Sequence, residues 1–362
     1  MEELKEARSK IEAIDKKMAE LFEERMQCSR QISELKKLHG LSIRDSVREA
    51  ALIEKNRKFI TDSQIEEYYV DFLKNTIDTS CKYQERLLCG MKVAYCGKNG
   101  AFANIAAKKT FPTAQLLAYS SFEKAYAAVE NGECDCAVLP LENSYAGEVG
   151  TVLDLIYSGS LYINQVVSLP IIHNLIGMEG SAREDIKTVV SHPQALSQCS
   201  EYIEKNGWKT ISYSNTATAA QYVKDLGDKS VAAIASDVTA EADGLKIIEA
   251  RVNDNPNNTT RFAVFSKVQN KPSLFAKEDK ENFILVFTVK NQAGSLAQTL
   301  NILGAHGYNM RSLRSRPMKD LRWNYYFYIE AEGNINTENG RDLLNELSVL
   351  CANLKLAGVY SD

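Results

Sequence analysis

The chain has 362 residues, 44% of them apolar and 25% charged, which is the composition of a globular protein large enough for two or three domains. Its formal net charge of −4 and the lack of any apolar run near roughly 18 residues exclude a strongly basic nucleic-acid-binding surface and a membrane-spanning helix. The eight cysteines lack paired metal-ligand spacing and the N-terminus has no signal-peptide core, so we expect reduced thiols, no metal site and a cytoplasmic location.

An apolar seam predicts one long helix at the N-terminus. Apolar residues recur at alternating spacings of three and four over residues 4–35, which is the pattern of a coiled-coil helix. A coiled-coil dimer would explain Arg8 and Lys36 on the flank of the seam, but not Arg25 within it, where a cation needs an anionic partner. Arg8 and Arg25 lie roughly 25 Å apart along such a helix, so a small ligand contacting both needs a second chain.

Two shorter helices are expected next. Ser46-Val-Arg-Glu49 is a capping-box pattern that predicts a helix start. A third helix is expected over about 63–88, with Ser80 and Gln84 on one face. Residues 1–90 resemble the all-α, three-helix chorismate mutase domain, which implies an intertwined homodimer, sites shared between chains and no cofactor. The resemblance implies these chorismate-binding residues: Arg8, Arg25, Lys36, Asp45, Arg48, Glu49, Ser80 and Gln84.

The resemblance also implies a role for each kind of side chain. The two arginines match the carboxylates of chorismate, because guanidinium forks bind carboxylates in pairs. Lys36 and Gln84 would stabilise the charge that develops on the ether oxygen during the pericyclic step. Glu49 and Asp45 would engage the ring hydroxyl.

Strands and helices alternate over residues 91–267, which predicts an α/β fold with mainly parallel sheets. Ligands bind outside the carboxyl ends of such strands. Polar clusters stand at these ends at 142–144, 192–198 and 215–218, and the polar loop 253–259 runs directly into the strand-like segment Thr260-Arg-Phe. The loop Gly97-Lys-Asn-Gly100 precedes a helix whose N-terminus is open to an anion.

These stretches resemble prephenate dehydratase, whose domain has two periplasmic-binding-protein-like lobes around a cleft. Thr260 matches the catalytic threonine, which would assist departure of the ring hydroxyl as prephenate loses carbon dioxide. Arg261 either orients Thr260 or holds the lobes together, and His192 is an acid, a donor or a loop element. Ala101 and Ala103 stand where the family has hydroxyl residues. The implied prephenate-binding residues are Glu142, Asn143, Ser144, His192, Gln194, Gln198, Thr216, Thr218, Arg261 and Phe262.

After a charged linker at 268–281, residues 282–362 follow the order βαββαβ, which is typical of an α+β ferredoxin-like domain. This segment resembles the amino-acid-sensing ACT domain, with Ser295 for the family's Ala and Arg314 for its Glu. A purely structural dimerisation domain is the alternative. The implied phenylalanine-binding residues are Gly294, Ser295, Leu296, Arg314, Ser315, Arg316 and Pro317.

Together the three resemblances predict a bifunctional enzyme that converts chorismate to prephenate and prephenate to phenylpyruvate. L-phenylalanine is the expected effector, and a homodimer or higher homo-oligomer the expected assembly. One alternative is a ligand-sensing regulator with a helical dimerisation domain, but the first ninety residues offer no basic recognition helix. Another is a protein in which only the mutase is active, because Ala101 and Ala103 remove two hydroxyl groups from the dehydratase.

Overall fold

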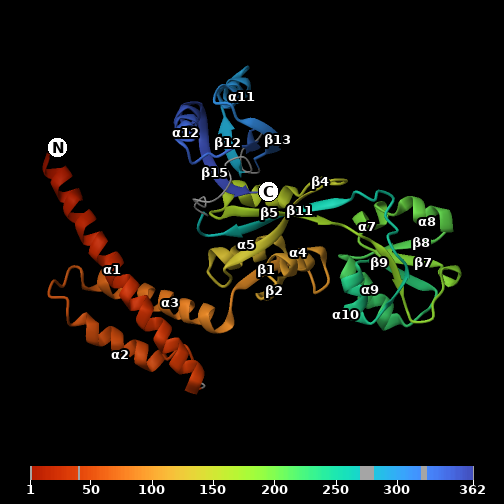
Figure 1. The fold of residues 1–362 in the computed structure, drawn as a ribbon, viewed down its shortest axis with the longest axis horizontal. Helices are drawn as coiled ribbons and strands as arrows, with labels where there is room; N and C mark the ends of the chain where they lie inside the picture. The colour runs from red at the N-terminus through yellow and green to blue at the C-terminus, as the bar shows by residue number, and fades with distance from the viewer. Residues whose placement is uncertain (1, 40, 270–280, 319–323, 362) are drawn as a thin grey trace. The chain divides into compact units, whose positions relative to one another are not determined.

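The computed structural model describes residues 2–39, 41–269, 281–318 and 324–361, so residues 270–280 of the expected linker lie outside the described residues. The chain divides into two compact units, Met1–Met91 and Lys92–Asp362 (Figure 1). Each unit is described by itself.

The first unit consists of α1 (Glu2–His39), α2 (Ser46–Arg57) and α3 (Glu66–Cys89). As the seam predicted, α1 is one unbroken helix of 38 residues, and α3 packs against both other helices. The capping box was placed one residue too late. Asp45 is the N-cap of α2, because its Oδ1 accepts the N–H of Arg48 at 3.0 Å and Glu49 reaches back to its backbone N–H.

Lobe 1 of the second unit is built on one half of the larger sheet, with three helices packed against its strands (Figure 1). Lobe 2 contains the five-stranded sheet in the order β10-β6-β9-β7-β8. The elements of lobe 1 are β1 (Lys92–Cys96), α4 (Phe102–Thr110), β2 (Gln115–Tyr119), α5 (Phe122–Glu130), β3 (Cys136–Asn143), β4 (Gly147–Glu148), α6 (Gly150–Ser158), β5 (Tyr162–Pro170) and β11 (Thr259–Ser266). The elements of lobe 2 are β6 (Asn174–Gly177), a short 3-10 turn (Arg183–Asp185), β7 (Thr188–Ser191), α7 (Pro193–Ser197), α8 (Ser200–Asn206), β8 (Lys209–Ser212), α9 (Thr216–Leu226), β9 (Val231–Ala235), α10 (Asp237–Asp243) and β10 (Lys246–Glu249).

The sheets are mixed rather than mainly parallel, which corrects the prediction. β1 pairs in parallel with β2 and β3, and β7 with β8 and β9. The chain crosses between the lobes twice, after β5 and after β10, so an outgoing and a returning strand lie together in each lobe. These run antiparallel: β11 pairs with β5 and β3, and β6 with β10 and β9. Residues 193–206 form two short helices, α7 and α8, on either side of Gln198 and Cys199.

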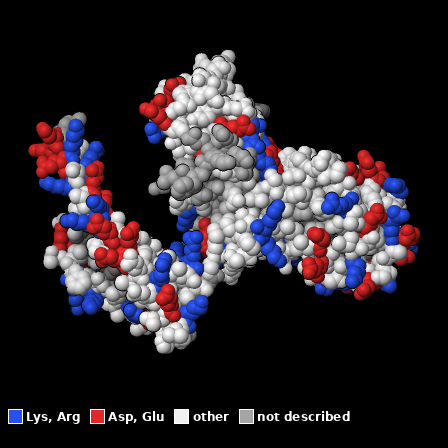
Figure 2. All heavy atoms as spheres, viewed as in Figure 1, with Lys and Arg blue, Asp and Glu red and all other residues white. Residues whose placement is uncertain are grey.

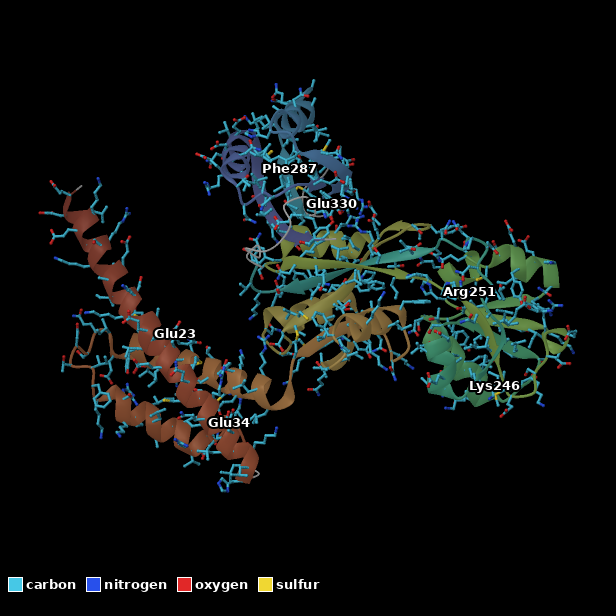
Figure 3. All side chains as sticks on the ribbon, viewed as in Figure 1. Glu23, Glu34, Lys246, Arg251, Phe287 and Glu330 are labelled. Atoms are coloured by element: carbon cyan, nitrogen blue, oxygen red, sulfur yellow. The ribbon has the colours of Figure 1, made fainter. Side chains whose placement is uncertain are left out.

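The C-terminal domain has the predicted order, with β12 (Glu281–Val289), α11 (Ser295–Ala305), β13 (Asn309–Pro317), β14 (Tyr325–Glu332), α12 (Glu338–Leu350) and β15 (Cys351–Ser361). Its antiparallel sheet, β13-β14-β12-β15, continues into lobe 1 where β15 meets β5. Gly358 makes this approach possible, because a Cβ there would lie 2.4 Å from the Ile163 carbonyl oxygen. Phe283, Leu285 and Phe287 pack into the domain's own core, with Phe287 labelled in Figure 3, while Ile284 and Val286 pack into the core of lobe 1.

Charges of both signs are interspersed over lobe 2 on the face drawn in Figure 2. Within the described residues, no helix is both long and apolar enough to cross a membrane. In the same part of the chain, no group of three or more His, Cys, Asp or Glu side chains is arranged to hold a metal ion.

Candidate active sites

A cavity of about 840 Å³ lies between the two lobes and is lined by residues of both. Lobe 1 contributes the ends of β1 and β3, the start of β11 and the first turn of α4, and lobe 2 contributes the starts of α7 and α9. The cavity is lined by Thr260, the expected catalytic residue, and by seven residues of the expected prephenate-binding set: Asn143, His192, Gln194, Gln198, Thr216, Thr218 and Phe262.

Thr260 reaches this cavity because successive residues of a strand point to opposite faces. Thr260 and Phe262 line the cavity, whereas Arg261 between them forms ion pairs on the other face of the sheet. Thr260 is only 8% exposed. Asn143 lies opposite it in the register of β3 and β11, with Nδ2 2.9 Å from Thr260 Oγ.

Backbone amides fix the orientation of the Asn143 carboxamide. Its Oδ1 accepts the backbone N–H groups of Tyr145 and Ala146 at 3.0 and 2.9 Å, and a backbone N–H acts only as a donor. Nδ2 therefore donates to Thr260 Oγ. Among the described residues no acceptor for the Thr260 proton is found, so the hydroxyl can donate to a group in the cavity.

Glu142 and Arg261 belong to the expected prephenate-binding set but do not line the cavity. Arg261 Nη1 lies 2.5 Å from Glu142 Oε1, and its Nη2 lies 2.5 Å from Glu330 Oε1 and 2.8 Å from the Tyr360 hydroxyl. Two roles were open for Arg261, orienting Thr260 or holding the lobes together. Its contacts instead join β11 to strands of the C-terminal domain, where Glu330 lies (Figure 3).

The network around these residues compensates its own buried charges. Burial would raise the pKa of Glu142, but the hydrogen bonds and charges of Arg261 and Arg314 lower it overall. Burial likewise opposes the charge on Arg261, yet Glu330 and Glu142 outweigh it and raise the pKa of Arg261. Glu330 is fully buried, so its pairing with Arg261 is the contact on which the network most depends.

Three other residues of the expected set hold nearby backbone in place. Ser144 Oγ, which does not line the cavity, accepts the N–H of Thr259 at 3.0 Å. His192 Nδ1 accepts the N–H of Gln194 at 3.2 Å and caps α7, and burial lowers the pKa of His192. Thr218 Oγ donates to the Asn215 carbonyl at 2.8 Å in the capping box of α9. His192 is thus at least a loop element.

The first turn of α4 opens toward the cavity without a side-chain cap, as the glycine loop predicted. Ala101 and Ala103, which replace hydroxyl residues of the family, both line the cavity. Gly100 packs against lobe 2: its carbonyl accepts from Ser236 and Thr239 hydroxyls at 3.0 Å each. Its φ is +85°, and a Cβ would lie 2.8 Å from Thr239 Oγ.

In the helical unit, Arg25 and Ser80 meet at one carbonyl. Arg25 Nη1 donates to Thr76 O at 3.2 Å, and Ser80 Oγ donates to the same oxygen at 2.9 Å. Burial lowers the pKa of Arg25. Among the residues described in this unit, Arg25 has no carboxylate partner, so an anionic ligand would stabilise its charge.

The other expected chorismate-binding residues divide into two groups. Glu49 lies 3.9 Å from Cys81 Sγ. Burial raises the pKa of this thiol, and the nearby positive charge of Lys36 acts in the opposite direction. Gln84, one turn after Ser80, is buried and its Oε1 has no partner. In contrast, Arg8 and Arg48 are exposed, and Asp45 caps α2.

Comparison with known proteins identifies all three segments. The family models match in order: chorismate mutase type II over residues 7–85, prephenate dehydratase over 93–270 and ACT domain over 283–349. A bifunctional chorismate mutase/prephenate dehydratase from Aquifex aeolicus is 31% identical, over 99% of this chain and 98% of its own. The chain belongs to the bifunctional chorismate mutase/prephenate dehydratase family.

Two solved structures resemble the second unit of this family member. A prephenate dehydratase from Arthrobacter aurescens, in complex with L-Phe, superposes with a TM-score of 0.70 at 26% identity, covering 75% of this chain and 90% of its own. A protein described as a novel type of quorum quenching acylase superposes with a TM-score of 0.67 at 31% identity, covering 75% of this chain and 97% of its own.

The family models and the bifunctional relative together give the activities. The chorismate mutase/prephenate dehydratase is an isomerase and a lyase of phenylalanine biosynthesis, and the regulator and mutase-only alternatives are not favoured.

The two expected phenylalanine motifs of the ACT domain differ in their contacts. Gly294, with φ +85°, is the exposed N-cap of α11. Arg314 contacts Glu142, and Arg316 lies 3.0 Å from Asp154 Oδ1, so both arginines of the second motif engage the dehydratase domain. Ser315 lies between them and is exposed.

His173 is a cavity residue that sequence reasoning missed in the chorismate mutase/prephenate dehydratase. It lines the cavity, is 2% exposed and lies 2.9 Å through Nε2 from Gln198 Oε1. The signal available was a histidine shortly after the end of strand β5, a place where ligands gather. Its partner Gln198 lies 25 residues further along the chain, which no local pattern predicts.

Proposed function

We propose that the cavity between the two lobes is the dehydratase site and that Thr260 assists departure of the ring hydroxyl of prephenate. The observation that carries this proposal is the hydrogen bond from Asn143 Nδ2 to Thr260 Oγ at 2.9 Å. Because Oγ accepts from the protein, its proton is available to a substrate oxygen in the cavity.

The chemistry needs a donor at one end of the substrate and anion binding at the other. As the ring carboxylate leaves as carbon dioxide, its electron pair moves into the ring and expels the hydroxyl, which leaves as water after gaining a proton. A hydrogen bond from Thr260 stabilises the charge on the departing oxygen. The uncapped first turn of α4, together with Lys98 and Thr216 in the lining, would hold the carboxylates.

A matched pair of variants tests the role of Thr260. Thr260→Val keeps the β-branched shape and removes the donor, so prephenate turnover should fall by roughly 10²-fold or more. Thr260→Ser keeps a hydroxyl and should retain part of the activity. If valine leaves near-normal turnover, or if serine is no better than valine at equal melting temperature, Thr260 does not assist the reaction.

For the mutase site we propose that Arg25, Lys36, Glu49, Ser80 and Gln84 bind chorismate between the three helices, with Arg8 supplied by a second chain. The support is the partly buried Arg25 without an internal anion, and the exposed apolar seam of α1, where Leu4, Ile11 and Ile14 are each more than half exposed. A second α1 would cover such a seam, and we therefore propose at least a homodimer.

Feeding purified protein with chorismate tests both sites at once. Phenylpyruvate as the product supports both activities in one chain. Accumulation of prephenate alone would contradict the dehydratase proposal, and unchanged chorismate would contradict the mutase proposal. Assaying the protein on added prephenate tests the dehydratase independently of the mutase.

We further propose that L-phenylalanine is the effector, bound between paired ACT domains near Gly294–Leu296 and Arg314–Pro317. The support is the ACT domain and the L-Phe complex of the Arthrobacter aurescens relative. Calorimetry should detect phenylalanine binding in the millimolar range or below, and its absence would refute the site. We place the enzyme in the cytoplasm, since the seven cysteines whose side chains are described are free thiols.

A further inference from the structure

His173 is held rigidly at the first crossover between the lobes. Its backbone N–H donates to Asn253 Oδ1 at 2.7 Å, and its carbonyl accepts the N–H of Val252 at 2.8 Å. The imidazole also packs edge-on against Phe102, with ring centroids 5.5 Å apart. The second crossover and the first turn of α4 therefore fix the position of the ring.

A chain of hydrogen bonds runs from this ring to Thr260. His173 Nε2 lies 2.9 Å from Gln198 Oε1, Gln198 Nε2 lies 3.4 Å from Asn143 Oδ1, and Asn143 Nδ2 lies 2.9 Å from Thr260 Oγ. All four residues are buried and line the cavity. Gln198 belongs to lobe 2, whereas Asn143 and Thr260 belong to lobe 1, so the chain spans the gap between the lobes.

The direction of every bond in this chain follows from the backbone. The N–H groups of Tyr145 and Ala146 make Asn143 Oδ1 an acceptor. Gln198 therefore presents its Nε2 to Asn143 and its Oε1 to His173, and His173 must carry its proton on Nε2.

The other ring nitrogen agrees with this tautomer. His173 Nδ1 is buried and has no hydrogen-bond partner among the described residues. A buried N–H without an acceptor is rarer in proteins than an unsatisfied acceptor, so Nδ1 is best assigned as a bare lone pair. Burial also lowers the pKa of His173, which keeps the ring neutral.

We propose that His173 is a positioning residue of the dehydratase, whose Nε2–H locks Gln198 so that its Nε2 adds to the two backbone N–H groups that hold Asn143 and Thr260 in their donating arrangement. This inference rests on the proposed role of Thr260. Without the His173 donor, Gln198 can rotate away or reverse, and a reversed carboxamide would set its oxygen against Asn143 Oδ1. His173 itself transfers no proton, because two carboxamides stand between it and Thr260.

Two polar, neutral variants that differ in reach test the proposal. His173→Gln places an amide nitrogen near the position of Nε2 and can still donate to Gln198, whereas His173→Asn is too short. We expect kcat for prephenate to fall about tenfold in His173→Asn, with KM within about twofold, and to stay within about threefold of wild type in His173→Gln. Equal losses in both variants, or a change in KM alone, would overturn the proposal.

A double-mutant cycle shows whether His173 acts through Thr260. In a Thr260→Val background, His173→Asn should cause less than a twofold further loss, since the hydroxyl it positions is gone. Multiplicative losses would overturn the proposal while leaving the Thr260 assignment intact. A normal Thr260→Val enzyme would instead refute that assignment and this inference with it.

The controls separate positioning from folding. Melting temperature reports the integrity of the second unit, and chorismate consumption normalises the concentration of active chains. If His173→Asn does not fold, Gln198→Met breaks the same chain at its middle and should lower kcat with the same loss of additivity toward Thr260→Val. A Gln198→Met enzyme with normal kcat would overturn the proposal.

Discussion

Replacing Arg261 with methionine should strongly destabilise the second unit. Glu330 is fully buried, and its one ion-pair partner among the described residues is Arg261, at 2.5 Å. Glu142 keeps Arg314 when Arg261 is removed, but among the described residues Glu330 keeps only the neutral hydroxyls of Tyr360 and Tyr328. Leaving one charge of a buried pair without its partner costs about 3–5 kcal/mol, so we expect a loss in that range.

Urea unfolding followed by circular dichroism measures this loss. With a slope of about 3 kcal/mol per molar urea, the midpoint should fall by roughly 1 M or more. Arg183→Met is the matched control, because Arg183 pairs with Glu249 at 3.4 Å while its side chain is 49% exposed. Such an exposed pair contributes about 0–1 kcal/mol.

A second substitution identifies the cause of the destabilisation. Adding Glu330→Leu to Arg261→Met removes the unpaired carboxylate and should restore much of the lost stability. A loss no larger than that of Arg183→Met, or a double variant less stable than Arg261→Met, would refute the reasoning.

Three further predictions concern the two units separately. Arg25→Ala should lose about 3–4 kcal/mol of transition-state stabilisation for chorismate while turnover of added prephenate survives, and mutase activity within tenfold of wild type would contradict the assignment. Mixing Arg8→Ala with Arg25→Ala chains should restore some mutase activity, because one site of the heterodimer keeps both arginines; verified subunit exchange without recovery would count against shared sites. Since the folded pKa of Glu142 lies below its ordinary 4.5, its contribution to stability is present above that pH and is lost as the pH falls through the folded pKa. Thermal unfolding from pH 6 to 3 should therefore show a shallower loss for Glu142→Gln than for wild type, and identical slopes would contradict this.

Local patterns in the sequence were sufficient for most of the fold. The seam of α1 and the alternation of strands and helices over residues 91–267 depend on neighbours along the chain, and both were predicted correctly. The antiparallel strands were not, because their direction depends on the two crossings between lobes. The capping box was misplaced because Asp45 and Ser46 are both good N-caps, and only the backbone path decides between them.

In the candidate site, too, local patterns predicted some features, whereas contacts with distant parts of the chain were missed. Thr260 and Asn143 stand at predicted strand ends, and strand alternation alone would have turned Arg261 and Glu142 to the other face. On that face Arg261 pairs with Glu330, 69 residues away in the chain, and Glu142 pairs with Arg314, 172 residues away. No local sequence pattern predicts such distant partners. His173 was missed for the same reason, because its partner Gln198 lies 25 residues further along the chain.

The two faces of the β3–β11 strand pair constrain which substitutions this protein can accept. Thr260 and Asn143 serve the cavity, while the adjacent Arg261 and Glu142 serve the contact with the ACT domain. A shortened chain ending before β12 would keep the face that lines the cavity but would remove Glu330, Tyr360 and Arg314 from the opposite face. A dehydratase without its ACT domain would therefore need compensating substitutions on β3 and β11, which couples the evolution of the two domains.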